Sequence, residues 1–173
     1  MRICLVRHTA VDVPRGVCYG QTDVPLCDTF EQESSAVMQK LKHLSPDAVY
    51  SSPLSRCTRL AAQCGYTGII LADELKEANF GDWELKEWDK IDMSVWAADG
   101  WKKNPPPGGE SLPQMVSRVS DFFDRLKQKP FRSVVIFTHG GVFGCVRVYL
   151  GLSDINNIFD MPFGYGTVWE FTL

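Results

Sequence analysis

The sequence predicts an α/β fold, a single domain in which a mostly parallel sheet carries helices on both faces. Short apolar runs typical of strands alternate along the chain with longer amphipathic segments typical of helices. The chain has 173 residues, of which 45% are hydrophobic, enough to bury one core without help from disulfides or metals. Neither a repeat nor a linker divides it, so we expect one domain over residues 1–173.

The expected strands are short apolar runs bounded by polar or turn-forming residues. The most continuous of them precedes a His-Gly-Gly sequence and has the composition of a strand buried on both faces. Strands are predicted at Ile3–Val6, Asp47–Tyr50, Gly68–Leu71, Val134–Phe137 and Thr167–Thr172.

Helix-start signals precede three segments. One helix is expected to be capped at residue 28 or 29 and to run to about residue 44. A second should begin at Ser52, with Pro53 in the first helical position, where its missing N–H is harmless. A third should begin after Ser111, which forms a capping box with Gln114.

The stretch between about residues 75 and 109 is expected to be irregular. It ends in Asn-Pro-Pro-Pro-Gly-Gly, which is incompatible with regular structure. It also holds four of the five tryptophans, which could stack on an aromatic substrate or anchor the segment to the core. Anchoring is the favoured interpretation for most of them: Trp83, Trp88, Trp96 and Trp101.

Composition argues against several classes of protein. A formal net charge of −3 is atypical of proteins that bind nucleic acid or a membrane surface, which usually carry a basic face. No run approaches the roughly 20 apolar residues of a membrane span, and we expect no signal peptide, because Arg7 and His8 interrupt the short apolar stretch near the N-terminus. The six cysteines form no C-x-x-C pair. We therefore expect a cytoplasmic protein with reduced thiols and without a metal or cofactor.

Three polar motifs follow expected strands. Arg7–Thr9 comes after the first strand, Ser51–Arg56 leads from the second strand into a helix, and His139–Gly141 follows the buried strand. Taken singly, each is compatible with a structural histidine or a solvated helix charge. The carboxyl ends of parallel strands meet at one edge of a sheet. Together the motifs would supply two histidines, two arginines and glycine-flanked amides, a set suited to a phosphoryl group.

The order of these motifs resembles the histidine phosphatase superfamily, which includes the phosphoglycerate mutases. The resemblance rests on Leu5–Thr9, Ser51–Arg56, Leu75–Glu77 and His139–Gly141, and it spans nearly the whole chain. It implies a phosphoglycerate mutase-like fold. The family's common Arg-His-Gly is Arg-His-Thr here, which leaves the histidine in place.

The resemblance implies a role for each matching residue. His8 would be the nucleophile that carries the phosphoryl group, and Glu77 would be the proton donor, ahead of the alternative carboxylates Glu74 and Glu84. Three residues would hold the phosphoryl oxygens, namely Arg7, Arg56 and His139. The expected substrate-binding residues are Arg7, Thr9, Gly20, Gln21, Arg56 and Gly140, of which the two from the segment 19–23 match less specifically.

The small size and the segment 17–26 resemble the α-ribazole phosphatase branch of cobalamin assembly. The alternatives are a broad-specificity sugar or nucleotide phosphatase, a phosphoglycerate mutase and, in another class, a non-catalytic module that binds phospho-ligands. A zinc hydrolase is disfavoured because the chain has three histidines and no H-E-x-x-H motif. The sequence leaves the oligomeric state open, and also whether Cys57 is sensitive to oxidation.

Overall fold

A five-stranded sheet forms the centre of the molecule. The computed structural model describes residues 1–96, 100–158 and 163–173, without the side chain of Val95. The strand order is β3-β2-β4-β1-β5, with β5 antiparallel to β1 and the other neighbours parallel. The expectation of a mostly parallel sheet is confirmed. The strands are β1 (Arg2–Arg7), β2 (Ala48–Ser51), β3 (Ile70–Leu71), β4 (Ser133–Thr138) and β5 (Val168–Thr172).

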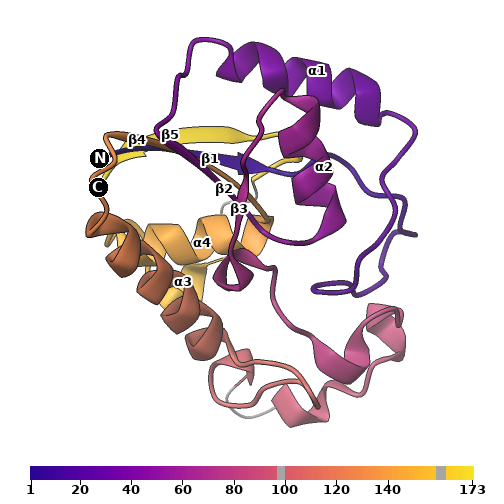
Figure 1. Cartoon of the computed structure of the whole chain (residues 1–173). Helices are drawn as coiled ribbons and strands as arrows, with labels where there is room; N and C mark the ends of the chain where they lie inside the picture. The colour runs from indigo at the N-terminus through magenta and orange to yellow at the C-terminus, as the bar shows by residue number, and fades with distance from the viewer. Residues whose placement is uncertain (97–99, 159–162) are drawn as a thin grey trace.

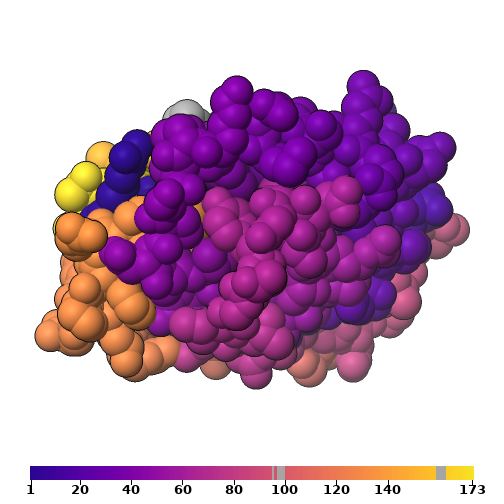
Figure 2. Space-filling view, turned by 45° about the horizontal axis from the view of Figure 1, so that its top comes forward, coloured from indigo at the N-terminus to yellow at the C-terminus, as the bar shows by residue number. Residues whose placement is uncertain are grey.

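Helices cover both faces of this sheet, as expected (Figure 1). The helices α1 (Phe30–Leu41) and α2 (Ser55–Gln63) lie on one face. The helices α3 (Leu112–Lys127) and α4 (Gly140–Tyr149) lie on the other. Figure 2 shows the indigo and purple N-terminal part of the chain sharing one surface with the magenta segment from the middle of the sequence.

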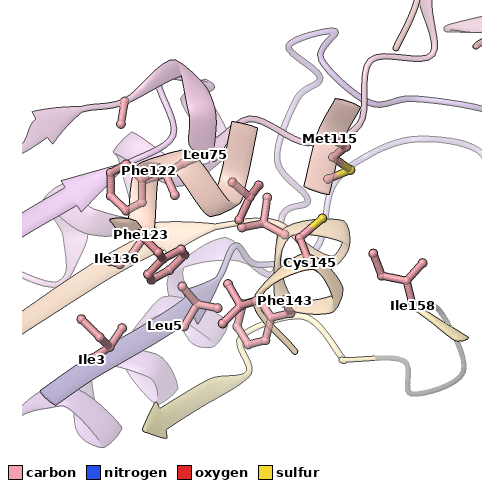
Figure 3. Close-up of a cluster of buried hydrophobic side chains, with 14 of the residues drawn as sticks. Ile3, Leu5, Leu75, Met115, Phe122, Phe123, Ile136, Phe143, Cys145 and Ile158 are labelled. Atoms are coloured by element: carbon pink, nitrogen blue, oxygen red, sulfur yellow. The ribbon is translucent and has the colours of Figure 1, made fainter. Parts of the chain in front are cut away.

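The central strands β1 and β4 are buried on both faces, because alternate side chains enter two separate cores. On the side of α3 and α4, Leu5 and Ile136 pack with Phe123 and Phe143 (Figure 3). Val6, which follows Leu5, enters the opposite core beneath α1 and α2. The ends of β1 and β4 are therefore held rigidly, which matters because two of the three polar motifs, Arg7–Thr9 and His139–Gly141, lie there.

The start of α2 differs from the expectation. Pro53 is not the first helical residue, because α2 begins at Ser55. The Ser52 N–H still donates to the Phe137 carbonyl (2.9 Å), so the chain extends its pairing with the end of β4 before it turns into the helix. The Asp23 carboxylate, from a distant loop, accepts from the Ser55 N–H (2.9 Å) and hydroxyl (2.8 Å) at this helix start.

Other elements keep their expected places with shifted ends. The helix expected to reach about residue 44 ends at Leu41. The strand β3 is confined to two residues, since Gly68 has φ +65° and leaves the extended region. The capping box of α3 is confirmed: the Ser111 N–H donates to Gln114 Oε1 (2.7 Å), and the Gln114 N–H donates to Ser111 Oγ (3.4 Å).

The described part of the segment from 75 to 109 contains short turns of 3₁₀ helix, irregular chain and one isolated bridge, from Glu87 to Val17. Its tryptophans pack on one another, with 4.6 Å between the ring centroids of Trp83 and Trp96. The Trp96 indole donates to the Asn104 carbonyl in the same stretch, and the Trp101 indole donates to the carbonyl of Glu110, just after it. No helix within the described ranges is long and apolar enough to cross a membrane.

Candidate active site

His8 lies directly after β1 and is 2% exposed. Its backbone is held on both sides, because its N–H donates to the Thr138 carbonyl (3.0 Å) and its carbonyl accepts from the Gly166 N–H (3.1 Å). In the side chain, Nδ1 lies 2.7 Å from the Thr9 carbonyl oxygen. Because that oxygen can only accept, Nδ1 carries the proton and Nε2 keeps a lone pair in the neutral ring.

Its surroundings keep the His8 ring neutral. The pKa of His8 is lowered to about 3, mainly by burial and next by the positive charge of Arg56. Arg7 adds a smaller lowering, while the hydrogen bond to the Thr9 carbonyl opposes the shift. A neutral imidazole with a free Nε2 lone pair is the form that can attack phosphorus.

Arg56, in the first turn of α2, is fully buried, so the interpretation of this residue as a solvated helix charge is wrong. Its guanidinium donates from Nη2 to the Gly20 carbonyl (2.5 Å) and from Nη1 to the Thr22 carbonyl (3.0 Å). Its Nε donates to His139 Nδ1 (3.3 Å). The positive charge is thus fixed in direction by three acceptors from two different segments.

His139 follows β4 and is fully buried, with its ring centroid 5.1 Å from that of His8. Since Nδ1 accepts from Arg56, Nε2 carries the proton and donates to Ser52 Oγ (2.8 Å). Burial and then Arg56 hold the pKa of His139 well below its usual value. Both ring nitrogens are engaged by protein groups, so in this arrangement His139 orients the Arg56 guanidinium.

Arg7 reaches across the carboxyl end of the sheet. Its Nη1 donates to the Phe163 carbonyl, and its Cζ lies 4.4 Å from the ring centroid of Tyr165. A Cβ at Gly140 would lie 3.2 Å from that Cζ, so the glycine leaves space for the guanidinium. Arg7 Nε and Thr9 Oγ1 are buried without a hydrogen-bond partner among the described residues.

Glu77 lines the same pocket as His8. Its Oε1 accepts from the Ala78 N–H (3.0 Å) and its Oε2 from the Gly141 N–H (3.1 Å), near the start of α4. A Cβ at Gly141 would overlap Glu77 Oε1, so the carboxylate depends on glycine at this position.

The pocket at His8 has a volume of about 300 Å³, and two kinds of group line it. Polar groups come from Arg7, His8, Glu77, Gly140 and Gly141, and aromatic or aliphatic side chains come from Tyr19, Ala78, Phe80, Ile158 and Phe163. None of the four tryptophans of the irregular segment lines it, which favours their interpretation as anchors. A larger hollow, of about 680 Å³, lies between β3 and the C-terminal end of α3, away from both buried histidines.

The structure does not bring every expected residue to the pocket wall. Arg7, His8, Glu77 and Gly140 line it, whereas Arg56 and His139 lie behind it and contact each other. The expected substrate contacts Thr9, Gly20 and Gln21 are likewise absent from the described lining. Gly20 instead presents its carbonyl to Arg56, and the Gln21 side-chain amide donates to the Glu77 carbonyl (3.1 Å).

Sequence reasoning missed three residues around the site. Arg118 of α3 donates to the carbonyls of residues 74, 76 and 77 and forms an ion pair with Glu110 (2.6 Å), so it holds the backbone that carries Glu77. Tyr165 lies beside His8 and donates or accepts a hydrogen bond with Tyr19 (2.8 Å). The sequence offered one signal for Glu110, its position directly before the capping box. Nothing in the sequence indicated Tyr165.

The thiol of Cys57 is fully buried and lies 3.5 Å from His139 Nε2. Burial raises the pKa of the Cys57 thiol well above its usual value. A buried thiol that keeps its proton is a poor nucleophile, which favours the interpretation of Cys57 as a packing residue. Among the residues that the structure describes, no three His, Cys, Asp or Glu side chains group as a metal site.

Comparison with models of protein families identifies the family of this chain. Residues 3–173 match the model of the histidine phosphatase superfamily, branch 1. This chain belongs to the histidine phosphatase superfamily. The resemblance inferred from the four motifs is therefore confirmed for nearly the whole chain.

Individual superfamily members are distant from this chain. It is 28% identical to the adenosylcobalamin/α-ribazole phosphatase of Escherichia coli over 154 residues, 82% of this chain and 75% of that protein. It is 30% identical to a probable phosphoglycerate mutase of Erwinia tasmaniensis over 165 residues, 88% and 76% of the two. The crystal structure of the α-ribazole phosphatase from Shigella flexneri superposes with a TM-score of 0.87 at 24% identity, over 98% of this chain and 89% of that one.

Proposed function

We propose that this protein is a metal-independent phosphomonoesterase that works through a phosphohistidine at His8 Nε2. The observation that carries the proposal is the state of His8. The ring is neutral, its Nδ1 proton is fixed on the Thr9 carbonyl, and it shares a pocket with the Arg7 guanidinium and the Glu77 carboxyl group. Membership of the histidine phosphatase superfamily supports the same chemistry.

In the first step, the Nε2 lone pair forms a bond to phosphorus and the bond between phosphorus and the ester oxygen breaks. Glu77, in its protonated form, gives its proton to the departing alkoxide, which leaves as an alcohol. Arg7 and Arg56 offset the negative charge on the transferred oxygens. Arg7 Nε and Thr9 Oγ1, two buried donors without partners among the described residues, would find acceptors in those oxygens.

In the second step, water attacks the phosphohistidine. Glu77, now a carboxylate, takes a proton from the water as its oxygen bonds to phosphorus. The bond between Nε2 and phosphorus breaks, and inorganic phosphate leaves with His8 returned to its neutral form. The hydrogen bond from Nδ1 to the Thr9 carbonyl persists and stabilises the cationic phosphoimidazole between the two steps.

Glu77→Gln is the decisive variant for the acid role. Hydrolysis of alkyl phosphates should fall on the order of 10²- to 10⁴-fold, whereas activated aryl phosphates, which leave without a proton, should lose much less. The matched control is Glu74→Gln, since Glu74 pairs with Arg125 at the surface. Equal losses on both ester classes would remove Glu77 from the acid role.

His8→Asn tests the nucleophile, and it also separates an enzyme from a non-catalytic binding module. The wild type should acquire acid-labile, base-stable phosphate from a labelled ester, and His8→Asn should acquire none. Turnover in excess chelator should match turnover without it. A wild type that binds phosphate esters but never releases phosphate would establish the binding module instead, and loss of turnover with chelator would contradict metal independence.

For the substrate, we propose α-ribazole 5′-phosphate. Aromatic and aliphatic groups from Tyr19, Phe80, Ile158 and Phe163 form an apolar part of the pocket lining, and Arg7 is the one cation among the described lining residues. An apolar wall suits a benzimidazole-bearing riboside better than the carboxylate of a phosphoglycerate, which would need a second cation. Two of the similar proteins bear the name of this activity.

A panel of monophosphates tests this choice. α-Ribazole 5′-phosphate should exceed sugar phosphates and ordinary nucleoside monophosphates in kcat/KM. Similar values across the panel would indicate a broad-specificity phosphatase. A phosphoglycerate mutase, favoured by the similarity to the Erwinia tasmaniensis protein, would move phosphate between the positions of phosphoglycerate without releasing it.

A further inference from the structure

The Glu84 carboxylate, outside the proposed chemistry, is saturated with hydrogen bonds. Its Oε1 accepts from the backbone N–H groups of Gln21 (2.9 Å) and Phe80 (3.1 Å). Its Oε2 accepts from the Thr22 N–H (2.5 Å) and from the Thr22 hydroxyl. Burial would raise the pKa of Glu84, but the hydrogen bonds from Thr22, Gln21 and Phe80 outweigh it and lower the pKa.

The segment held by Glu84 is Gly20–Thr22, which we call the 20–22 loop. On its opposite side, the carbonyls of Gly20 and Thr22 accept from Nη2 (2.5 Å) and Nη1 (3.0 Å) of Arg56. The loop therefore lies between a half-buried carboxylate and a fully buried guanidinium.

One peptide unit joins these two charges directly. The Gln21 N–H that Glu84 accepts and the Gly20 carbonyl that Arg56 binds belong to the same planar peptide. In a trans peptide the N–H and C=O point in opposite directions, so fixing the N–H at Glu84 fixes the direction of the carbonyl at Arg56. The carboxylate also polarises this peptide and strengthens its carbonyl as an acceptor.

Steric packing restricts the loop further. A Cβ at Gly20 would overlap the Ala78 carbonyl oxygen and would lie 3.0 Å from Glu84 Oε1. The loop therefore approaches the backbone after Glu77 as closely as glycine permits. The Gln21 side-chain amide also donates to the Glu77 carbonyl, so the loop contacts the segment of the acid as well.

We infer that Glu84 is a positioning residue for phosphoryl binding, which acts through the 20–22 loop to hold the Arg56 guanidinium. The inference rests on the proposed phosphatase function. It also explains why Glu84 is not the acid: its two oxygens accept four donors and it is absent from the described lining of the pocket.

The first test is Glu84→Gln, measured with orthovanadate as a phosphoryl mimic. The side-chain NH₂ of the glutamine would face the N–H and hydroxyl donors of the 20–22 loop. Because two donors cannot bond to each other, the loop would be released. We expect the inhibition constant of orthovanadate to rise about 10- to 100-fold, with an unchanged ratio of alkyl to aryl ester hydrolysis. Glu87→Gln is the matched control, because Glu87 pairs with exposed Lys90 and should change neither quantity.

A double-mutant cycle with Arg56→Lys shows whether Glu84 acts through Arg56. Lysine keeps the charge but lacks the fork that spans the two loop carbonyls. Glu84→Gln should then weaken orthovanadate binding far less in the Arg56→Lys background than in the wild type. Additive effects, or a changed ratio of alkyl to aryl hydrolysis, would overturn the inference.

A second variant and the wild-type activity cover two other possible results. If Glu84→Gln fails to fold, Thr22→Val removes only the hydroxyl donor to Glu84 and keeps the carbonyl that Arg56 binds. It should weaken orthovanadate binding in the same direction, and unchanged binding would count against the inference. Failure of the phosphatase proposal is distinguishable, because the wild type would then release no phosphate from any ester.

Discussion

At the scale of single residues, the site depends on which nitrogen of each histidine carries a proton. The Thr9 carbonyl fixes the proton of His8 on Nδ1, and the Arg56 Nε–H fixes the proton of His139 on Nε2. Both assignments follow from neighbours that can only accept or only donate. The two rings lie 5.1 Å apart with Arg56 close by, so neither can gain a proton without repulsion from a buried cation.

Proton NMR of the histidines can check this state directly. We expect the ring resonances of His8 and His139 to stay constant between pH 8 and pH 5, because burial and Arg56 lower the pKa of both and bring that of His8 to about 3. Arg56→Met should move the His8 midpoint upward. A wild-type His8 resonance that titrates near the ordinary histidine value, about 6.5, would contradict the assignment.

Gly141 gives a second prediction at this scale. Gly141→Ala should displace the Glu77 carboxylate, since the added Cβ would overlap its Oε1. Turnover of alkyl phosphates should fall about 100-fold, the size expected for an ångström of misplacement, with a smaller loss for aryl phosphates. Gly164→Ala is the control, because among the described residues its Cβ would meet nothing nearer than Thr167 Oγ1 at 3.9 Å. Equal behaviour of the two variants would be inconsistent with the proposed acid.

At the scale of elements, strands present the two buried histidines while a helix holds the segment of the proposed acid. His8 and His139 follow the adjacent parallel strands β1 and β4, whose register aligns Arg7 with Thr138. Glu77 lies outside any strand, and its backbone is held instead by Arg118 of α3 through the carbonyls of residues 74, 76 and 77. The register of α3 against this segment therefore decides where the acid lies.

Arg118→Met tests that dependence. The variant leaves Glu110 mostly buried without its cation, so stability should fall by about 3 kcal/mol, measured by urea unfolding. Alkyl ester turnover should fall more than orthovanadate affinity, because Glu77 moves while Arg7 and Arg56 stay. Adding Glu110→Gln should restore part of the stability, since the unpaired charge is removed. A variant with wild-type stability and turnover would show that α3 does not hold the acid.

At the scale of the whole molecule, the buried neutral histidines link stability to pH. The unfolded chain binds protons on His8 and His139 below about pH 6.5, while the folded chain binds none on His8 until about pH 3. Stability must therefore decrease as pH falls below about 6.5, by about 1.4 kcal/mol per pH unit for each histidine. Urea unfolding between pH 7.5 and 5 measures the slope. His8→Asn should reduce this slope. His43→Asn is the control, because His43 lies on the surface.

Most of the fold and the centre of the site could be predicted from the sequence, since they depend on local patterns. The apolar runs predicted the central strands, and the motifs after them predicted His8, Arg56 and His139 as residues of the candidate site. The roles of Glu84 and Arg118 in holding backbone could not be recognised. Their partners Thr22 and Glu77 lie 62 and 41 residues away in the sequence, and most of the atoms they bind are backbone atoms, which leave no side-chain pattern. The start of α2 was misplaced for the same reason: the group at its N-terminus comes from a remote loop.

The backbone of His8 lies between two segments from the far end of the chain. Its N–H is bound by the end of β4, and its carbonyl and the preceding N–H are bound by residues 166 and 167, just before β5. During synthesis, the proposed nucleophile His8 leaves the ribosome early, yet its position is fixed only when a segment more than 150 residues later has emerged. Assembly of the candidate site therefore requires closure of a loop of more than 150 residues, a step that contact order makes slow. A nascent chain arrested before β5 would display His8 without the geometry to use it.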